Sequence, residues 1–210
     1  MGGGLATTPL YVSLNGVKMR KYLFVILSLF LMQCATSKIS ELYQIYNKQD
    51  YLYWSEDRKL TWNDFEGEQL SSSDNFGGEI HILNPSSIEK LNMFSPVKLT
   101  TICVFDKKHS WVNKKFANQN LLLYNQVIFD IYELYTRKLR ETFDNTNFGL
   151  NDYTDKFHKI TEEINNELNN RIDKFRKESN MGQNGETISN WNNQINNELE
   201  TLKNYKQDYQ

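Results

Sequence analysis

The fold is decided by residues 120–143, NLLLYNQVIFDIYELYTRKLRETF. This stretch contains neither Pro nor Gly, and at 100° per residue its apolar side chains gather on one broad stripe, which predicts a single long helix. The stripe consists of Leu121, Leu123, Tyr124, Val127, Ile128, Ile131, Tyr132, Leu134, Tyr135, Leu139 and Phe143. A stripe this wide predicts a helix that is mostly buried.

Polar side chains lie roughly opposite the stripe. They are Gln126, Asp130, Glu133, Arg137 and Arg140. Glu133 and Arg137 are four residues apart, so we expect them to form a weak pair on the surface of the helix. Asp130 lies about 120° from Tyr124 on the helix, and we expect it to hold a neighbouring loop or strand.

Composition is typical of one globular domain. The chain has 210 residues, of which 39% are hydrophobic and 24% charged, enough for a substantial core. Residues 1–33 hold three basic residues and no acidic one, so the remainder has 21 basic and 26 acidic residues. This mildly acidic balance gives no electrostatic reason to expect nucleic acid as a partner. The two cysteines, Cys34 and Cys103, predict no disulfide framework.

Residues 1–33 are predicted to be an N-terminal extension and signal peptide. Residues 19–21 (MRK) are basic, and residues 22–32 form an apolar run that is too short for a comfortable membrane span. Residues 1–18 have neither feature, so the natural start is predicted at Met19. The chain is therefore expected to be exported.

The end of this segment resembles a bacterial lipoprotein signal, with Cys34 as the lipidated residue. Leu31 matches that pattern, whereas Gln33 replaces the usual small residue before the cysteine. Cleavage after Ser37, or retention of the segment as an anchor, are the alternatives. The resemblance implies a lipoprotein of the bacterial cell envelope that faces the periplasm or the cell surface. Its first partner would be the membrane, through the lipid at Cys34.

Residues 34–50 are predicted to be a tether or short helix, and residues 51–205 the folded domain. Residues 76–83 and 97–105 are the best strand candidates, because they are rich in Ile, Val, Thr and Phe and partly alternate. In the second strand Cys103 shares a face with Phe105, which predicts a buried and unreactive thiol.

Two further helices follow the first. Residues 152–177 repeat apolar side chains every three or four positions, and the same spacing runs from Ile188 to Leu202. Residues 179–185 separate these helices with two glycines. Trp62, Trp111 and Trp191 are expected in the core or between sheet and helices. The fold class is α+β: a small N-terminal antiparallel or mixed sheet followed by three long helices.

Four separated segments resemble the domain-of-unknown-function family of predicted secreted zinc-dependent proteases. They are residues 58–67 (RKLTWNDFEG), residues 104–106 with 110–112 (VFD and SWV), residues 122–140 of the long helix, and residues 179–182 with 191–192 (SNMG and WN). Together they span most of the domain. The resemblance implies a zinc-peptidase-like fold.

The chain departs from the family at the metal site. The family carries His-Glu-Gln-x-His-Phe-Asp, in which two histidines four residues apart bind one zinc and the glutamate activates water. Here Tyr124 and Ile128 stand in place of the histidines and Asn125 in place of the glutamate. Met181 replaces the histidine of an Asn-His-Gly loop. Gln126 and other neighbours without a part in metal chemistry are retained.

The sequence therefore predicts a pseudoenzyme with a binding or scaffolding role, without metal ligands, catalytic residues or a cofactor, and with a protein or peptide as partner. Tyr124 and Ile128 are expected to fill the former metal cleft. The alternative is a zinc-dependent peptidase or other metalloenzyme with relocated ligands. It would require His81, His109 or His158, which are isolated in sequence, to cluster with a carboxylate. Two of their imidazoles about 4–5 Å apart would favour it over the pseudoenzyme, given zinc–nitrogen distances near 2 Å.

Overall fold

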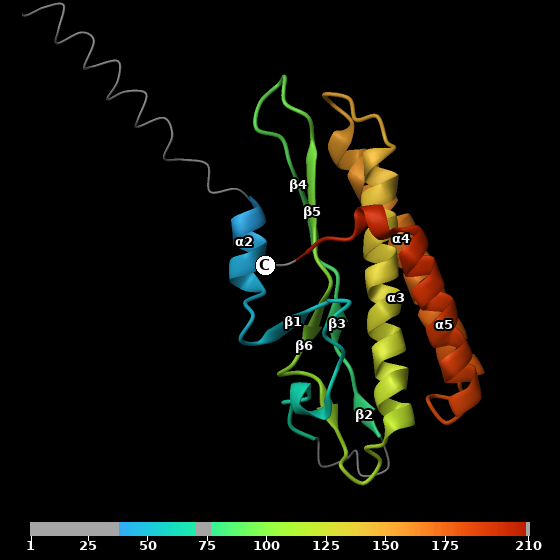
Figure 1. Cartoon of the computed structure of the whole chain (residues 1–210). Helices are drawn as coiled ribbons and strands as arrows, with labels where there is room; N and C mark the ends of the chain where they lie inside the picture. Colours follow the sequence, from blue (N-terminus) through green and yellow to red (C-terminus); the bar gives the residue numbers. More distant parts are fainter. Residues whose placement is uncertain (1–37, 70–76, 209–210) are drawn as a thin grey trace, which may run out of the picture. The chain divides into compact units, whose positions relative to one another are not determined.

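A long central helix, α3 (Gln119–Asp144), organises the computed structural model of the protein, which describes residues 38–69 and 77–208 (Figure 1). Its first turn is capped by Asn118, whose side chain accepts a hydrogen bond from the N–H of Leu121 at 2.9 Å. Two further helices, α4 (Tyr153–Glu178) and α5 (Gly185–Thr201), pack on α3. All three long helices predicted from the sequence are confirmed.

The strands are short and pair only in antiparallel fashion. One sheet has the order β1–β6–β3, and two separate two-stranded pairs are β2–β7 and the hairpin β4–β5. The strands are β1 (Tyr51–Tyr53), β2 (Gly78–Glu79), β3 (Ile82–Leu83), β4 (Ser86–Glu89), β5 (Lys98–Thr101), β6 (Val104–Asp106) and β7 (Trp111–Val112). The predicted α+β class, with a small N-terminal sheet portion before three long helices, is confirmed.

Each predicted strand is divided in two. Residues 97–105 contain β5 and β6, because β5 pairs with β4 while β6 pairs with β1 and β3. Residues 76–83 contain β2 and β3, which also take different partners. The sequence did not predict β4, whose residues Ser86–Glu89 have little apolar alternation. The strand with which a segment pairs depends on the tertiary structure, so the local sequence pattern does not predict where the partner changes.

The two faces of the β6 segment enter different clusters. Cys103 and Phe105 join the main core with α3, while Ile102 and Val104 join a smaller cluster with Tyr53. This confirms the predicted alternation and the burial of Cys103, whose thiol pKa is raised by that burial. The smaller cluster is completed by aromatic rings of the predicted tether.

The predicted tether contains a helix, α2 (Lys38–Ile45). Its Tyr43 ring stacks on Tyr53 of β1 with centroids 5.6 Å apart, and the Tyr53 hydroxyl donates to the carbonyl of Tyr46. Within residues 38–69 and 77–208 no helix is both long and apolar enough to cross a membrane. The predicted signal peptide and Cys34 lie outside the described residues.

Candidate binding cleft

One cavity of about 380 Å³ brings together all four positions at which the chain departs from the zinc-protease pattern. Tyr124 and Ile128 lie one turn apart on α3 with Asn125 between them, and Met181 reaches the same cavity from the loop between α4 and α5. The remaining lining residues are Gly77, Gly78, Glu79, Ile80, Leu121, Arg176 and Gln183. This cavity is called the cleft below.

The loop between α4 and α5 approaches α3 closely. Asn180, Met181 and Gly182 have φ values of 49°, 52° and 89°, so three consecutive residues adopt left-handed conformations. Backbone hydrogen bonds hold the loop, including one from the N–H of Met181 to the carbonyl of Arg176 at 2.8 Å. A Cβ on Gly182 would lie 3.2 Å from the Tyr124 ring. The loop therefore packs its backbone against the aromatic ring of Tyr124.

Tyr124 and Ile128 form a wall of the cleft and leave it open. Tyr124 stacks on Phe175 of α4 with centroids 5.1 Å apart, and Phe175 in turn contacts Trp191 of α5 at 5.2 Å. Both side chains, which the sequence places at the former metal site, are buried, and a cavity remains beside them between α3 and β2.

Two charged side chains face the cleft. Arg176 interacts with the Tyr124 hydroxyl, and its nearest carboxylate in an ion pair is Asp173 at 3.9 Å on an exposed surface. Glu79 is already engaged, because it accepts from the Trp111 indole N–H at 3.2 Å and lies 3.1 Å from His81 Nε2. Of the two charged side chains, Arg176 is therefore the one better placed to bind a ligand of opposite charge.

The β2 strand borders the cleft with an edge that no described strand covers. The N–H of Asn113 donates to the carbonyl of Gly77 at 3.0 Å, which makes residues 77 and 79 the hydrogen-bonded positions opposite β7. By alternation, the backbone groups of Gly78 and Ile80 point away from β7. These groups offer donors and acceptors of the kind that an added strand uses.

The donors at the four family positions do not fit a zinc ion. Ile128 has no donor atom, Asn125 is a poor substitute for a catalytic carboxylate, and Met181 offers only a thioether. Burial raises the pKa of the Tyr124 phenol above its ordinary value of 10, against a smaller opposing effect of Arg176, so the phenolate ligand is still harder to form. We therefore derive no metal chemistry from this cleft.

The histidines are less isolated in space than in sequence. His81 and His109 have ring centroids 6.1 Å apart, and each is paired with a carboxylate, Glu79 at 3.1 Å and Asp106 at 2.7 Å. His158 lies on α4 beside Phe157. The separation between the centroids of the His81 and His109 rings exceeds the 4–5 Å expected for two imidazoles that share a zinc ion. Among residues 41–69 and 77–208, no three His, Cys, Asp or Glu side chains are placed to hold a metal.

The polar side of α3 is buried, which corrects the expected surface pair. Glu133 is fully buried, and its Oε1 accepts from Arg137 Nε at 2.9 Å. Arg137 also donates to the carbonyl of Leu199 at 2.8 Å and lies 4.9 Å from the Trp54 ring. The reason is that α3 lies between the strands on one side and α4 and α5 on the other, so the side that carries Glu133 and Arg137 is covered as well (Figure 1).

Asp130 holds the segment after β1, as predicted. Its Oδ1 accepts from the Trp54 indole N–H at 2.7 Å and from Gln126 Nε2 at 2.8 Å. Gln126 in turn accepts from the backbone N–H of Leu60 at 2.8 Å. The same segment is shaped by Asp64, which forms an ion pair with Arg58 and closes a capping box. Gln126 and Asp130 therefore connect α3 to the segment after β1.

Of the three tryptophans expected in the core, two are buried. Trp111 and Trp191 are each 5% exposed, whereas Trp62 is only partly buried and packs on Phe65 with centroids 5.2 Å apart. Trp62 opens a 3₁₀ turn (Trp62–Asp64) in which Asp64 is the buried residue.

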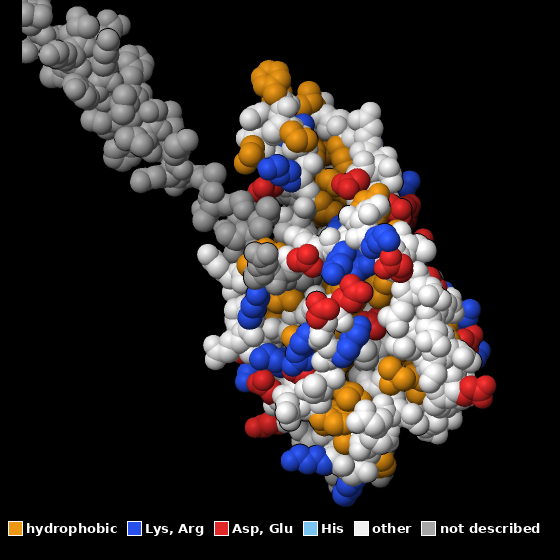
Figure 2. All heavy atoms as spheres, viewed as in Figure 1, with side chains coloured by type: hydrophobic (Ala, Val, Ile, Leu, Met, Phe, Trp, Pro, Cys, Tyr) orange, Lys and Arg blue, Asp and Glu red, His pale blue; other side chains and the backbone are white. Residues whose placement is uncertain are grey.

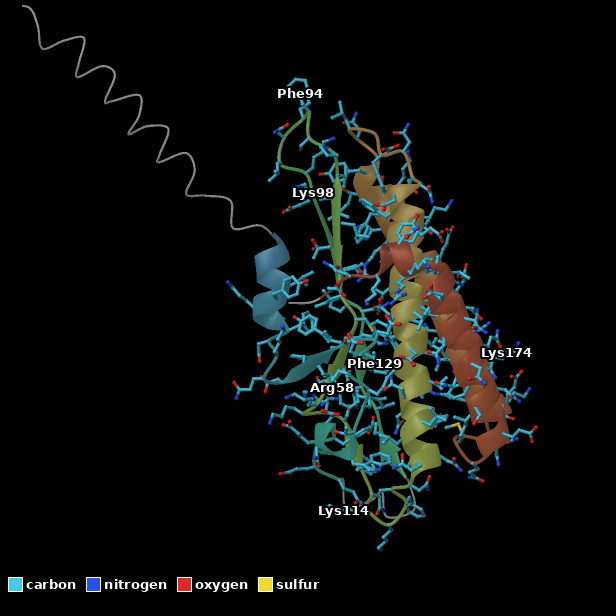
Figure 3. The ribbon with its side chains drawn as sticks, in the orientation of Figure 1. Arg58, Phe94, Lys98, Lys114, Phe129 and Lys174 are labelled. Carbon is cyan, nitrogen blue, oxygen red and sulfur yellow. The ribbon has the colours of Figure 1, made fainter. Side chains whose placement is uncertain are left out.

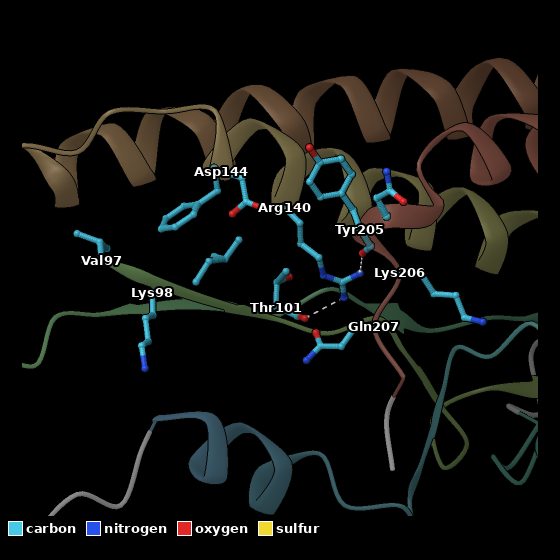
Figure 4. A pocket seen from close by; sticks show the side chains of 11 residues that line it. Val97, Lys98, Thr101, Arg140, Asp144, Tyr205, Lys206 and Gln207 are labelled. Atoms are coloured by element: carbon cyan, nitrogen blue, oxygen red, sulfur yellow. Dashed lines mark hydrogen bonds between the residues drawn. The ribbon is translucent and has the colours of Figure 1, made fainter. Parts of the chain in front are cut away.

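A second cavity, of about 450 Å³, lies between β5, the end of α3 and residues 204–207 (Figure 4). Arg140 donates there to the carbonyls of Tyr205 at 2.8 Å and Thr101 at 3.1 Å. The Arg140 guanidinium therefore connects the C-terminal segment to β5, and we assign this residue a structural role in the cavity. None of the family positions reaches it.

Comparison of the chain with protein-family models, curated proteins and solved structures finds no match.

Proposed function

We propose that this protein is a non-catalytic member of the bacterial cell envelope, anchored through a lipid on Cys34, which holds an extended peptide segment of a partner in the cleft. The observation that carries the proposal is the convergence of Tyr124, Asn125, Ile128 and Met181 on one cavity. These residues come from two separate segments and replace every metal-chemistry position of the family that the chain resembles.

The distribution of retained and replaced residues supports the same proposal. Gln126, Asp130 and Arg137 are retained, and each makes a buried hydrogen bond that ties α3 to its neighbours. The replaced residues lie on the cleft wall. A chain that keeps the scaffold and loses the metal chemistry retains a shaped cavity, and that cavity remains able to bind a ligand.

The chemistry of the cleft favours a peptide in extended conformation. The open edge of β2 supplies backbone groups at Gly78 and Ile80, and the opposite wall of Leu121, Tyr124 and Ile128 is apolar. Main-chain pairing with such an edge gives affinity, while alternate side chains fill the apolar wall. A carboxylate on the peptide would complement Arg176.

The test is a selection of phage-displayed random dodecapeptides on the full-length chain in lipid nanodiscs. Enriched peptides are then measured by fluorescence anisotropy against two variants. Gln183→Trp places a large ring at the rim of the cleft, and Glu186→Trp places the same ring on the exposed first turn of α5, outside it. Both positions are exposed, so neither variant should unfold the protein.

We expect Gln183→Trp to weaken binding at least roughly tenfold and Glu186→Trp to leave it unchanged, since only the first ring obstructs the cleft. Arg176→Ala should weaken the binding of peptides that carry a carboxylate more than the binding of neutral peptides. Equal binding to both tryptophan variants would show that the peptides bind elsewhere. A selection without enriched peptides would also contradict the proposal.

A further inference from the structure

The hairpin of β4 and β5 ends in an exposed apolar tip. Leu91, Met93 and Phe94 are 61%, 66% and 92% exposed. Phe94 projects from one end of the molecule, beyond the helices and the sheet (Figure 3). Apolar side chains gather at the same end in the space-filling view (Figure 2). The hairpin tip, residues 91–94, therefore presents its apolar groups as a convex point.

The turn at the tip is held by its own hydrogen bonds. Asn92 Oδ1 accepts from the N–H of Phe94 and from that of Ser95, both at 2.9 Å. The Ser95 hydroxyl oxygen also accepts from the N–H of Asn92 at 2.9 Å. This network fixes the backbone that carries Phe94, so the ring is displayed by a formed turn.

Neighbouring groups extend the same surface. Lys90 lies 5.6 Å from the centroid of Tyr153, which brings the loop before α4 beside the hairpin, and that loop carries Leu150 at 54% exposure. Of the eight large hydrophobic side chains exposed among the described residues, Leu91, Met93, Phe94 and Leu150 lie at this end. Lys98, also exposed, flanks the tip.

The chain enters the folded unit close to this hairpin. The unit begins at Lys38, the first residue of α2, and α2 contacts β4. Cys34 precedes Lys38 by four residues, which span at most about 14 Å when fully extended. A lipid on Cys34 would therefore hold the bilayer within that reach of Lys38, the first residue of α2.

We propose that the hairpin tip inserts Leu91, Met93 and Phe94 into the interfacial region of the bilayer that carries the lipid anchor. This inference rests on the anchoring proposed above. A convex apolar point needs a concave pocket or a fluid medium to bury it, and tethering keeps the bilayer at high effective concentration. Lys90 and Lys98 lie beside the tip, with Glu89 opposite Lys98 in the β4–β5 pair, and Phe and Leu are typical of membrane-inserted side chains.

Insertion at this end would hold the cleft away from the membrane. Val97 of the hairpin and Phe143 line one cavity at the end of α3, while Tyr124 lies in the cleft nineteen residues earlier. At 1.5 Å per residue this separation is about 28 Å along the helix. The hairpin tip and the lipid anchor would attach the domain to the membrane at two points, and the cleft would then face the aqueous compartment.

The test uses the full-length lipidated chain with a nitrobenzoxadiazole fluorophore on Phe94→Cys, because Cys103 is buried and Cys34 carries the lipid. The matched control places the label on Lys114→Cys, an exposed position at the opposite end (Figure 3). Both are reconstituted in vesicles of phosphatidylethanolamine and phosphatidylglycerol with nitroxide-labelled lipid. Vesicle flotation reports anchoring separately.

We expect blue-shifted emission and at least roughly threefold stronger nitroxide quenching at position 94 than at position 114. A chain that floats with vesicles while the label at 94 stays in water would overturn the tip proposal and leave the anchor intact. A label that is shielded but not quenched by nitroxide lipid would show a protein pocket as the occupant and also overturn it. Failure to float would refute the anchor and the tip proposal together.

Discussion

Asp130 shows how a single buried carboxylate shapes this protein. It receives hydrogen bonds from Trp54 and Gln126, and Lys59 Nζ lies 3.8 Å from its Oδ1. Burial nevertheless raises the pKa of Asp130 above its ordinary value of 3.8, because the loss of water outweighs these partners. The folded protein therefore holds this proton at a pH at which the unfolded chain has released it.

The free energy of unfolding should depend on pH through this group. Between pH 3.8 and the raised pKa, the native state binds more protons than the unfolded state, so the stability contributed by Asp130 falls as pH rises. Asp130→Asn keeps the acceptor for Trp54 and cannot titrate. In urea denaturation, the stability of the wild type relative to the variant should be higher at about pH 4 than at about pH 8.

The comparison with Asp130→Asn isolates one group. Burial would raise the pKa of Asp64, but hydrogen bonds from Arg58 and Thr61 lower it below its ordinary value. The stability that Asp64 contributes is therefore lost on acidification. This loss is the same in the wild type and in Asp130→Asn, so it cancels in the comparison. A relative stability that stays constant with pH, or rises toward alkaline pH, would refute the raised pKa.

Glu133 and Arg137 show what spacing alone misses at the residue scale. A pair at i and i+4 has the same signature on an exposed helix and inside a core. Here Arg140 Nη1 also approaches Glu133 Oε1, at 3.4 Å, and Arg137 reaches the carbonyl of Leu199. The pair connects α5 to α3 through Arg137. This role depends on the position of α5 and cannot be predicted from the sequence of α3 alone.

At the scale of elements, the α4–α5 loop decides the shape of the cleft. Its backbone passes against the Tyr124 ring at Gly182, where φ is 89°. A side chain at this position meets both a disfavoured backbone conformation and the ring. The glycine is therefore required by two independent constraints.

Gly182→Ala should reduce the free energy of unfolding by about 1–2 kcal/mol, because alanine is strained at positive φ and its Cβ would lie 3.2 Å from Tyr124. Gly185→Ala is the matched control: the new Cβ would meet only the Asn120 side chain, which can move, at the start of α5. We expect the control to change stability by less than about 1 kcal/mol in either direction. Equal losses in urea denaturation would refute the account.

At the scale of the whole molecule, the geometry of the cleft can be tested by introducing zinc donors at four of its positions. A chain with Tyr124→His, Asn125→Glu, Ile128→His and Met181→His should take up about one zinc per protein, since these positions line one cavity and two lie four apart on a helix. Zinc is measured by mass spectrometry after purification without chelator. The wild type should take up far less than one equivalent.

The control for zinc uptake carries Tyr124→Phe and Ile128→Leu, which alter the same wall without adding a donor, and circular dichroism checks that each variant is folded. A folded fourfold variant without zinc would contradict the retained ligand geometry. Near-stoichiometric zinc in the wild type would contradict the non-catalytic proposal and direct attention to His81 and His109, whose rings lie 6.1 Å apart.

Much of the architecture follows from local pattern. The three helices match their predicted ranges to within a few residues, because apolar repeats of three and four, capped by Asn118 and Asn184, are properties of each segment. The strands were predicted less well. The chain changes partners at Ile102 and Cys103, and β4 lacks an apolar pattern because its residues are only partly buried.

By itself, the sequence determined the helices, the buried stripe of α3 and the absence of zinc donors at Tyr124, Asn125 and Ile128, because all of these reside in residue identity and spacing. Only the tertiary structure decided that α3 is buried on its polar side as well, since that depends on elements packing from both directions. It also decided that Met181 joins the α3 positions beside an open strand edge. Convergence of distant segments is a property of packing, which no local pattern contains.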